Sequence, residues 1–253
     1  MPQHPPTPFW RSLAGKKLSL SVVLVCALII AAIWAGTLQR IAFEREQAVA
    51  AAMQSNANLA IAYEEQVFRT LKAAEQVAAF VREEYLRVGP GIPLRQWVER
   101  GVIREEQFSV INVVNAVGDI IVSTTDNPNI GKTNYADRPF FQAQRHGRED
   151  RLYVNPPVVG RVSGTQQIPM SLRITRADGS FGGVVVMAVN PARFTGAYQH
   201  NDLGSPVLLE LTGLDGMVRA RDADRQLSMD AHALPWFQRQ REAAQGSFVD
   251  DGA

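Results

Sequence analysis

The feature of this sequence that most limits its fold is an uncharged apolar run near the N-terminus. Residues 18–39 read "LSLSVVLVCALIIAAIWAGTLQ" and contain no Asp, Glu, Lys, Arg or His. A helix rises about 1.5 Å per residue, so this run would be about 33 Å long, which matches the hydrocarbon core of a bilayer. The run therefore predicts one transmembrane helix.

The charges that precede this run predict its orientation. Arg11, Lys16 and Lys17 lie before it, and basic residues favour the cytoplasmic side of a membrane. We expect residues 1–17 in the cytoplasm and the chain beyond residue 39 outside it. A cleavable signal peptide is the alternative, because alanines follow the apolar core. The length of the run and the helical pattern that continues past it favour an uncleaved anchor.

Residues 40–88 predict a long stalk helix. They contain no Pro or Gly and are rich in Ala, Glu, Gln and Leu, which favour helices. Apolar residues recur there at steps of three and four and form one stripe. The stripe consists of Ala60, Tyr63, Val67, Leu71, Ala74, Ala78, Val81 and Tyr85. It must be buried against the folded domain, a second copy of the chain, or both, so we expect a homodimer.

After "VGPGIP" the apolar period changes from helical to strand-like. Residues 108–125 predict two strands around a turn at residues 116–119. Residues 152–189 predict three more short strands, with Asp178 and Gly179 in a hairpin turn. Two short helices are expected, at residues 137–145 and 190–199. The predicted fold class is therefore α+β, with an antiparallel sheet after the long helix.

A weak internal repeat predicts two tandem modules, residues 89–200 and 201–253. "INVVNAVGDIIVST" aligns with "LLELTGLDGMVRAR" at an offset of 97 positions, strand on strand and turn on turn. A helix is expected at "ALPWFQRQREA". Few strands can follow it, so we expect the second module to be incomplete.

The composition argues against several classes of function. The net charge is +1 without a basic stripe, which disfavours nucleic acid as a partner. The lone Cys26 and four scattered histidines give no metal-ligand spacing, so we expect no metal and no cofactor. "IGKT" ends like a phosphate loop, but Asp126 stands at the first glycine position. "GRVSG" misses the nucleophile-elbow spacing, and we expect no catalytic residues.

Aromatic and cationic residues cluster at predicted strand and helix ends, as in a small-molecule pocket. The predicted ligand contacts are Tyr135, Asp137, Arg138, Phe141, Tyr153, Arg161 and Arg173. An arginine among them would bind a carboxylate or phosphate through two hydrogen bonds. Alternatives stay open: Arg138 could pair with Asp137, and one of Phe140 and Phe141 packs in the core. Arg173 faces either solvent or the cleft under the aromatic helix.

Three motifs in this order resemble the double Cache (PAS-like) sensor regions of bacterial receptors. They are "NYADRPFFQAQR", "LYVNPPVVGRVSGTQQIPMSLRI" and "DGSFGGVVVMAVNPARFTGAY". The resemblance implies two stacked PAS-like modules, with the ligand in the membrane-distal one. It implies a periplasmic sensor on a single-pass protein of the bacterial inner membrane.

The same resemblance implies a function in signal transduction. The ligand would be an anionic metabolite or amino acid, and the output a diguanylate cyclase that these residues do not contain. A histidine kinase, a chemoreceptor or an anchored binding protein without output are alternatives. An extracytoplasmic hydrolase is a further alternative, for which the sequence supplies no nucleophile, base or metal.

Overall fold

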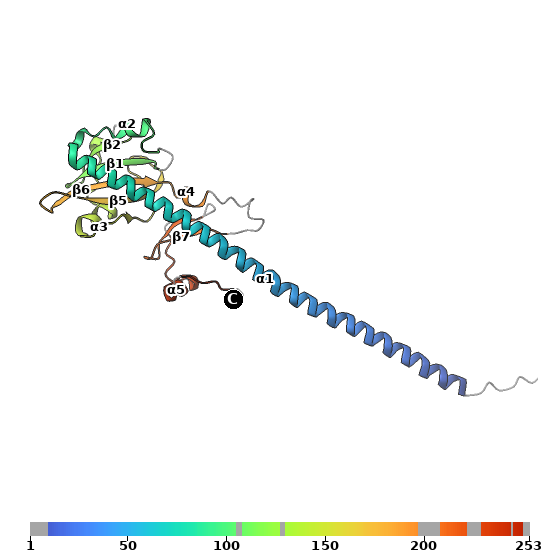
Figure 1. Cartoon of the computed structure of the whole chain (residues 1–253). Helices are drawn as coiled ribbons and strands as arrows, with labels where there is room; N and C mark the ends of the chain where they lie inside the picture. Colours follow the sequence, from blue (N-terminus) through green and yellow to red (C-terminus); the bar gives the residue numbers. More distant parts are fainter. Residues whose placement is uncertain are drawn as a thin grey trace, which may run out of the picture. The chain divides into compact units, whose positions relative to one another are not determined.

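The longest element is helix α1, Trp10–Val88, with 79 residues (Figure 1). The structure is a computed structural model that describes residues 10–104, 108–126, 130–196, 208–221, 229–243 and 245–249, with side chains from residue 22 on except that of residue 130. The chain divides into two units by its internal contacts. One consists of Met1–Ile61 with Ser247–Ala253, and the other is Ala62–Gly246.

In the first unit, α1 carries the apolar run. An 18-residue window of the helix has a mean hydropathy of 2.3, and none of it is buried in the protein. Large side chains there are more than half exposed, including Val23, Leu28, Ile33 and Trp34. Among the described residues this is the one helix long and apolar enough to cross a membrane.

The second unit contains an antiparallel sheet in the order β2-β1-β6-β5-β3, with β4 also paired to β5. Its strands are β1 (Val110–Asn115), β2 (Ile120–Ser123), β3 (Tyr153–Val154), β4 (Val158–Val159), β5 (Gln166–Thr175) and β6 (Phe181–Val189). The predicted turn at Gly179 joins β5 to β6, and its φ of 79° suits glycine. Where the sequence predicted three short strands, the structure has four, and β5 and β6 are long. The α+β fold class is confirmed.

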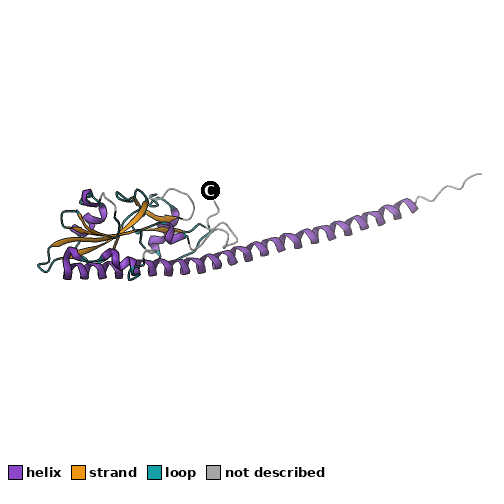
Figure 2. Cartoon of the chain, turned by 90° about the horizontal axis from the view of Figure 1, so that it is seen from above, coloured by secondary structure: helices purple, strands orange, loops and turns teal. Residues whose placement is uncertain are grey.

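The two faces of the sheet follow from strand alternation. Ile111, Val113 and Leu172 share one face, on the side of α1. Asn112, Ser171 and their neighbours share the other, which is covered by α3 (Pro139–His146). Figure 2 shows the sheet with the later part of α1 along one side. Both faces are buried, so the strands read as nearly continuous apolar runs rather than as alternating ones.

From Tyr63 onward the apolar stripe of α1 packs in the second unit, as its spacing predicted, whereas Ala60 at its start is exposed. Ala74, Ala78 and Val81 are fully buried, and Tyr63 and Val67 are 8% exposed. Small alanines let the helix approach the sheet closely. α1 therefore belongs to the hydrophobic core from about Tyr63 onward.

Short helices connect these elements: η1 (Gly89–Gly91), α2 (Leu94–Glu99), η3 (Ile130–Lys132) and α4 (Ala192–Thr195). The sequence did not predict α2, in which Leu94 is 1% exposed and Trp97 packs against Phe80 with 4.9 Å between ring centroids. The "GKT" letters fall at η3 and after it, not in a loop between a strand and an α-helix. The helix expected at 190–199 is α4, and residues 197–199 lie outside the described residues.

The residues of the predicted second repeat form β7 (Glu210–Thr212), β8 (Val218–Arg221) and, further along the chain, α5 (Pro235–Glu242). Each hairpin has a bulge in its register and a positive-φ glycine, Gly118 at 100° and Gly216 at 68°. Each glycine N–H donates to the carbonyl three residues earlier. Gly118 and Gly216 are 98 positions apart, whereas the sequence alignment used an offset of 97. The two hairpins therefore match best when their turn glycines and bulges are aligned.

Candidate ligand pocket

A small cavity lies on the α3 face of the sheet, under the turn after β4. The volume open to the centre of a water molecule is about 20 Å³. Its apolar lining includes Val110, Phe140, Val158, Pro169, Val186 and Ala188. Its polar lining consists of Asn112, Tyr135, Arg138, Arg161 and Gln167. The cavity thus brings together three predicted site residues, Tyr135, Arg138 and Arg161.

Arg138 stands directly before α3, at its N-cap position. Its Nη2 donates to the backbone carbonyl of Val159 at 3.2 Å, and this is its single side-chain hydrogen bond among the described residues. A guanidinium has five N–H donors in a planar fork. Arg138 therefore keeps donors that can bind an anion, and its charge is not paired with Asp137.

Asp137 pairs instead with Arg161. Nη1 of Arg161 donates to Asp137 Oδ1 at 2.7 Å and to the carbonyl of Asn134 at 2.6 Å, and Nη2 donates to Oδ2. The hydrogen bond from Arg161 lowers the pKa of Asp137, and the same bond raises the pKa of Arg161. This two-point pair joins the turn after β4 to the segment before α3, beside the cavity that Arg161 lines.

Tyr135 is a buried donor in the wall of the cavity. Its side chain packs edge-on against Phe140, with 5.4 Å between ring centroids. Burial raises the pKa of its hydroxyl, although Arg138 and Arg161 oppose that shift. The phenol is therefore protonated at neutral pH, when it can donate a hydrogen bond.

Asn112 and Gln167 are buried amides that were not among the predicted ligand contacts. Asn112 is 3% exposed, and its Oδ1 has no hydrogen-bond partner among the described residues. Gln167 accepts a hydrogen bond from Ser163 Oγ at 3.2 Å. A Cβ on Gly160 would clash with Ser163 Oγ and lie 2.6 Å from Gln167 Nε2, so a larger residue there would displace these two side chains.

Phe141 and Tyr153 do not line the cavity. Phe141 is fully buried and meets the edge of Phe181 at 5.3 Å, whereas the adjacent Phe140 lines the cavity. Neighbouring helical residues point about 100° apart, so only one of the two phenylalanines can face the cavity. Tyr153 packs against the same core from β3.

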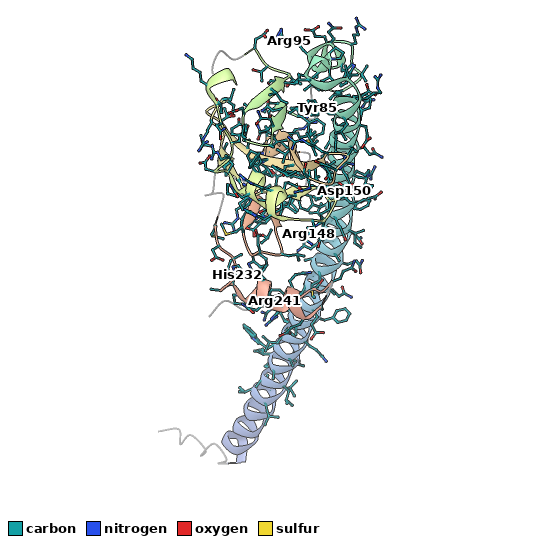
Figure 3. All side chains as sticks on the ribbon, turned by 90° about the vertical axis from the view of Figure 1, so that its left-hand side faces the viewer. Tyr85, Arg95, Arg148, Asp150, His232 and Arg241 are labelled. Atoms are coloured by element: carbon teal, nitrogen blue, oxygen red, sulfur yellow. The ribbon has the colours of Figure 1, made fainter. Side chains whose placement is uncertain are left out.

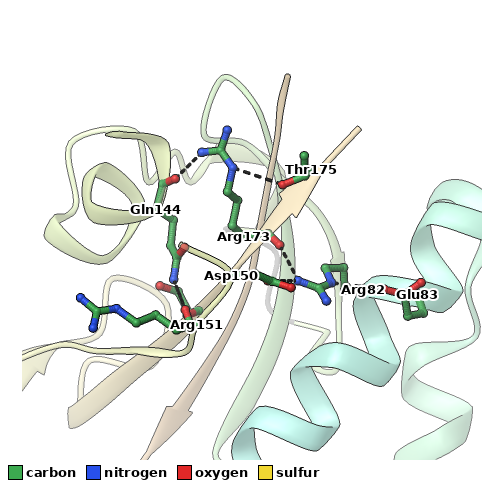
Figure 4. Close-up of polar contacts among 8 residues, drawn as sticks. Arg82, Glu83, Gln144, Asp150, Arg151, Arg173 and Thr175 are labelled. Atoms are coloured by element: carbon green, nitrogen blue, oxygen red, sulfur yellow. Dashed lines mark hydrogen bonds and ion pairs between the residues drawn. The ribbon is translucent and has the colours of Figure 1, made fainter. Parts of the chain in front are cut away.

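Arg173 lies under α3, as one of the two predicted alternatives had it, but at the far end of that helix. Its Nη1 donates to the carbonyl of Gln144 (Figure 4) and to those of Arg145 and Gly147, all at the end of α3. Its guanidinium also lies 4.8 Å from the ring centroid of Phe181. A cation at a helix C-terminus satisfies unpaired carbonyls and opposes the helix dipole. Arg173 therefore holds α3 on β5.

A second arginine joins β5 to α1. Arg82 Nη1 donates to the backbone carbonyl of Arg173 at 3.2 Å and pairs with Asp150 (Figure 4). Asp150 lies next to α1 in Figure 3, in the loop that follows α3. Gln144 Nε2 adds a hydrogen bond of 2.7 Å to the Ser171 carbonyl on β5. Polar contacts therefore run from α3 through β5 to α1.

The described residues contain no group of three His, Cys, Asp or Glu side chains that could hold a metal ion.

A signal for Asn112 was present in the sequence: it is a polar residue inside the apolar run "VINVV". A buried polar side chain normally has a partner, so an isolated one in a core strand points to a ligand or another buried group.

Comparisons with known proteins identify the fold. No family model and no curated protein sequence matches this chain. The extracellular domain of rpHK1S-Z16, described as a histidine kinase, aligns with a TM-score of 0.59 at 20% identity over 72% of this chain and 76% of its own. The ligand-binding domain of the Pseudomonas fluorescens chemoreceptor CtaA, in complex with L-serine, aligns with a TM-score of 0.56 at 12% identity, covering 70% and 76%.

A third structure has the same fold. The sensor domain of the Vibrio cholerae histidine kinase DctB aligns with a TM-score of 0.50 at 16% identity, covering 68% of this chain and 67% of its own. The chain has the fold of Cache-like extracytoplasmic sensor domains. The expected resemblance is confirmed at the level of the fold.

Proposed function

We propose that this protein senses a small anionic metabolite on the extracytoplasmic side of a bacterial inner membrane. The observation that carries the proposal is the guanidinium of Arg138, which lines the cavity without an ion pair among the described residues, whereas the guanidinium of Arg161 is paired with Asp137. Arg138 retains donors for an anion, and Tyr135 can donate from the wall. The serine complex of CtaA, which has the same fold, supports a small carboxylate-bearing ligand.

The apolar run supports a membrane location for the sensor. Its exposed side chains on α1 match the thickness of a bilayer core and would be covered by lipid. With residues 1–17 in the cytoplasm, the sheet would lie on the opposite side. A reporter enzyme fused after residue 61 tests this topology, and activity of a cytoplasmic reporter there would contradict it.

The transmission step would use contacts already present. A ligand held by Arg138 sits at the start of α3, and Arg173 and Gln144 hold the end of α3 on β5. Arg82 then links the carbonyl of Arg173 to α1. A ligand can shift α1 only if it binds two arrangements of these elements with different affinity. A homodimer through α1 would pass that shift to a paired output module.

A diguanylate cyclase is the output that the sequence resemblance supports. Histidine kinase and chemoreceptor outputs are the second candidate, because sensor domains of both kinds share this fold. The cyclic-di-GMP level of cells that express the complete gene, with and without ligand, distinguishes the two. An unchanged level would exclude the cyclase output and leave the sensor proposal intact.

A thermal-shift screen tests ligand binding directly. The full chain in detergent is heated with organic acids, amino acids or amines, and we expect stabilisation by small acids. Arg138→Ala should abolish that stabilisation, because the anion loses its charged hydrogen bonds. Arg151→Ala is the matched control, since that exposed arginine pairs with Glu149 away from the cavity. Full stabilisation of the Arg138→Ala variant would overturn the proposed pocket.

A further inference from the structure

The buried amide of Asn112 is the feature of the cavity that anion binding alone leaves unused. Its Oδ1 is an acceptor without a partner among the described residues, on a side chain that is 3% exposed. Buried polar atoms in folded proteins are nearly always hydrogen-bonded, because an unpaired one is unfavourable. This acceptor therefore points to a donor supplied by the ligand.

Asn112 and Arg138 border the same small volume. On β1, Asn112 shares the α3 side of the sheet with Val110, alternates with Ile111 and Val113, and lies opposite Val186 of β6. Both Asn112 and Arg138 line the cavity, which holds only about 20 Å³ for the centre of a water molecule. A ligand that meets both must carry an anionic group and a hydrogen-bond donor close together.

The charges decide which donor fits. No Asp or Glu lines the cavity, and the nearby carboxylate of Asp137 already receives two N–H groups of Arg161. An ammonium group placed there would meet the guanidinium of Arg138 without a lining carboxylate to balance it. A hydroxyl is neutral, so it can donate to the amide oxygen of Asn112 without repulsion from the guanidinium of Arg138.

We infer that the pocket selects short 2-hydroxycarboxylates. The carboxylate receives hydrogen bonds from Arg138, and the hydroxyl donates to Asn112 Oδ1. The small volume limits the ligand to two or three carbons in this arrangement of the turn after β4. This inference rests on the proposed function, and it adds the ligand class and the residue that sets it.

Isothermal titration of the full chain in detergent tests the inference with two matched series. One series is glycolate, acetate and glycine, and the other is L-lactate, propionate and L-alanine. Glycolate and L-lactate should bind about tenfold more tightly than acetate and propionate, because the hydroxyl pairs the buried acceptor. Glycine and L-alanine should bind no more tightly than the unsubstituted acids.

Two variants separate the role of Asn112 from a general effect on the fold. Asn112→Leu keeps the side-chain size and removes the acceptor, so the ratio of lactate to propionate affinity should fall to about one. Asn155→Leu is the control, because Asn155 Oδ1 is also buried without a partner among the described residues but Asn155 does not line the cavity. The ratio of lactate to propionate affinity in Asn155→Leu should equal that of the wild type.

Several outcomes would overturn the inference. One is a lactate-to-propionate affinity ratio of about one in the wild type. Another is tighter binding of glycine or L-alanine than of the unsubstituted acids. The third is a lactate-to-propionate ratio in Asn112→Leu that equals the wild-type ratio. The proposed function survives these results if Arg138→Ala still abolishes carboxylate binding. Absence of binding for all six compounds would also overturn the inference, whereas the proposed function fails only if the wider thermal-shift screen finds no stabilising acid. If Asn112→Leu fails to fold by circular dichroism, the wild-type ratios decide alone.

Discussion

The first module and the β7–β8–α5 segment have the same local construction but different polar residues. In both, a hairpin is followed by a single bridge and a helix with proline at its start. Gln142 Nε2 bonds the carbonyl of Ala136, and Gln238 Nε2 bonds the carbonyl of His232, at an offset of 96. Phe141 and Phe237 are buried at corresponding positions.

The cavity-lining Tyr135 and Arg138, and the Asp137 that pairs with Arg161, do not recur in the second segment. At the same offset, Ala231 replaces Tyr135, Ala233 replaces Asp137 and Leu234 replaces Arg138. The contacts that build the helix and turn are therefore retained, while the groups that could bind an anion are not. This difference separates residues that hold the fold from residues that give it a ligand, and it assigns the proposed binding to the first module.

The largest expected effect concerns the paired phenylalanines. Phe141→Ala should destabilise the protein by about 4 kcal/mol, because a fully buried aromatic side chain leaves a cavity. Phe237→Ala should cost about 3 kcal/mol or less, since Phe237 packs in a smaller cluster with Val218 and Ala231. Urea unfolding measures both, and equal losses would show that the two modules have equally tight cores.

The paired turn glycines give the next effect. A Cβ on Gly118 would lie 2.5 Å from the backbone nitrogen of Ala136, whereas on Gly216 it would meet the ring of His232, which can rotate. Gly118→Ala should therefore cost about 2 kcal/mol or more, and Gly216→Ala about 1 kcal/mol from its positive φ alone. Thermal unfolding ranks the two variants, and the reverse order would reject this account of the turns.

The cap on α3 should matter less. Arg173→Ala should lower stability by about 1–2 kcal/mol, because three carbonyls lose a charged donor. Arg176→Ala, on the exposed turn between β5 and β6, should change stability by less than about 0.5 kcal/mol. Chemical denaturation of both variants checks the difference. Equal losses would mean that Arg173 does not fix α3.

The smallest effect is the pH dependence of the Asp137–Arg161 pair. The pKa of Asp137 is lowered in the folded protein, so its stabilisation is present above about pH 4 and is lost as the pH falls through the lowered value. Asp137→Asn should therefore lose less thermal stability than the wild type between pH 5 and pH 3. Parallel pH curves for the two proteins would contradict the pair. Ala233, which corresponds to Asp137 in the second segment, has no ionisable side chain, so this pH dependence belongs to the first segment alone.

Much of the fold could be predicted from the sequence because its signals are local. The stripe of α1, the hairpin at Gly118 and the helix after Arg138 all follow from period and turn chemistry. The short helix α2 was missed because its six residues follow a proline-rich turn and are too few to show a helical period.

The site was less predictable because it depends on pairing between distant segments. Tyr135, Arg138 and Arg161 were selected from their chemistry, and the structure brings them to one cavity. Asn112 and Gln167 reach it only through the register of β1, β6 and β5, which local patterns do not fix. The contacts of Arg173 depend on where the end of α3 lies over β5, which the sequence pattern of either element does not fix.

A structure of the full chain with a bound short hydroxy acid tests the central claim most directly. The account predicts the carboxylate within hydrogen-bond distance of Arg138, on the α3 face of the first module, and no ligand at the β7–β8–α5 segment. An acid bound at that second segment, or bound in the first module without contact to Arg138, would contradict it.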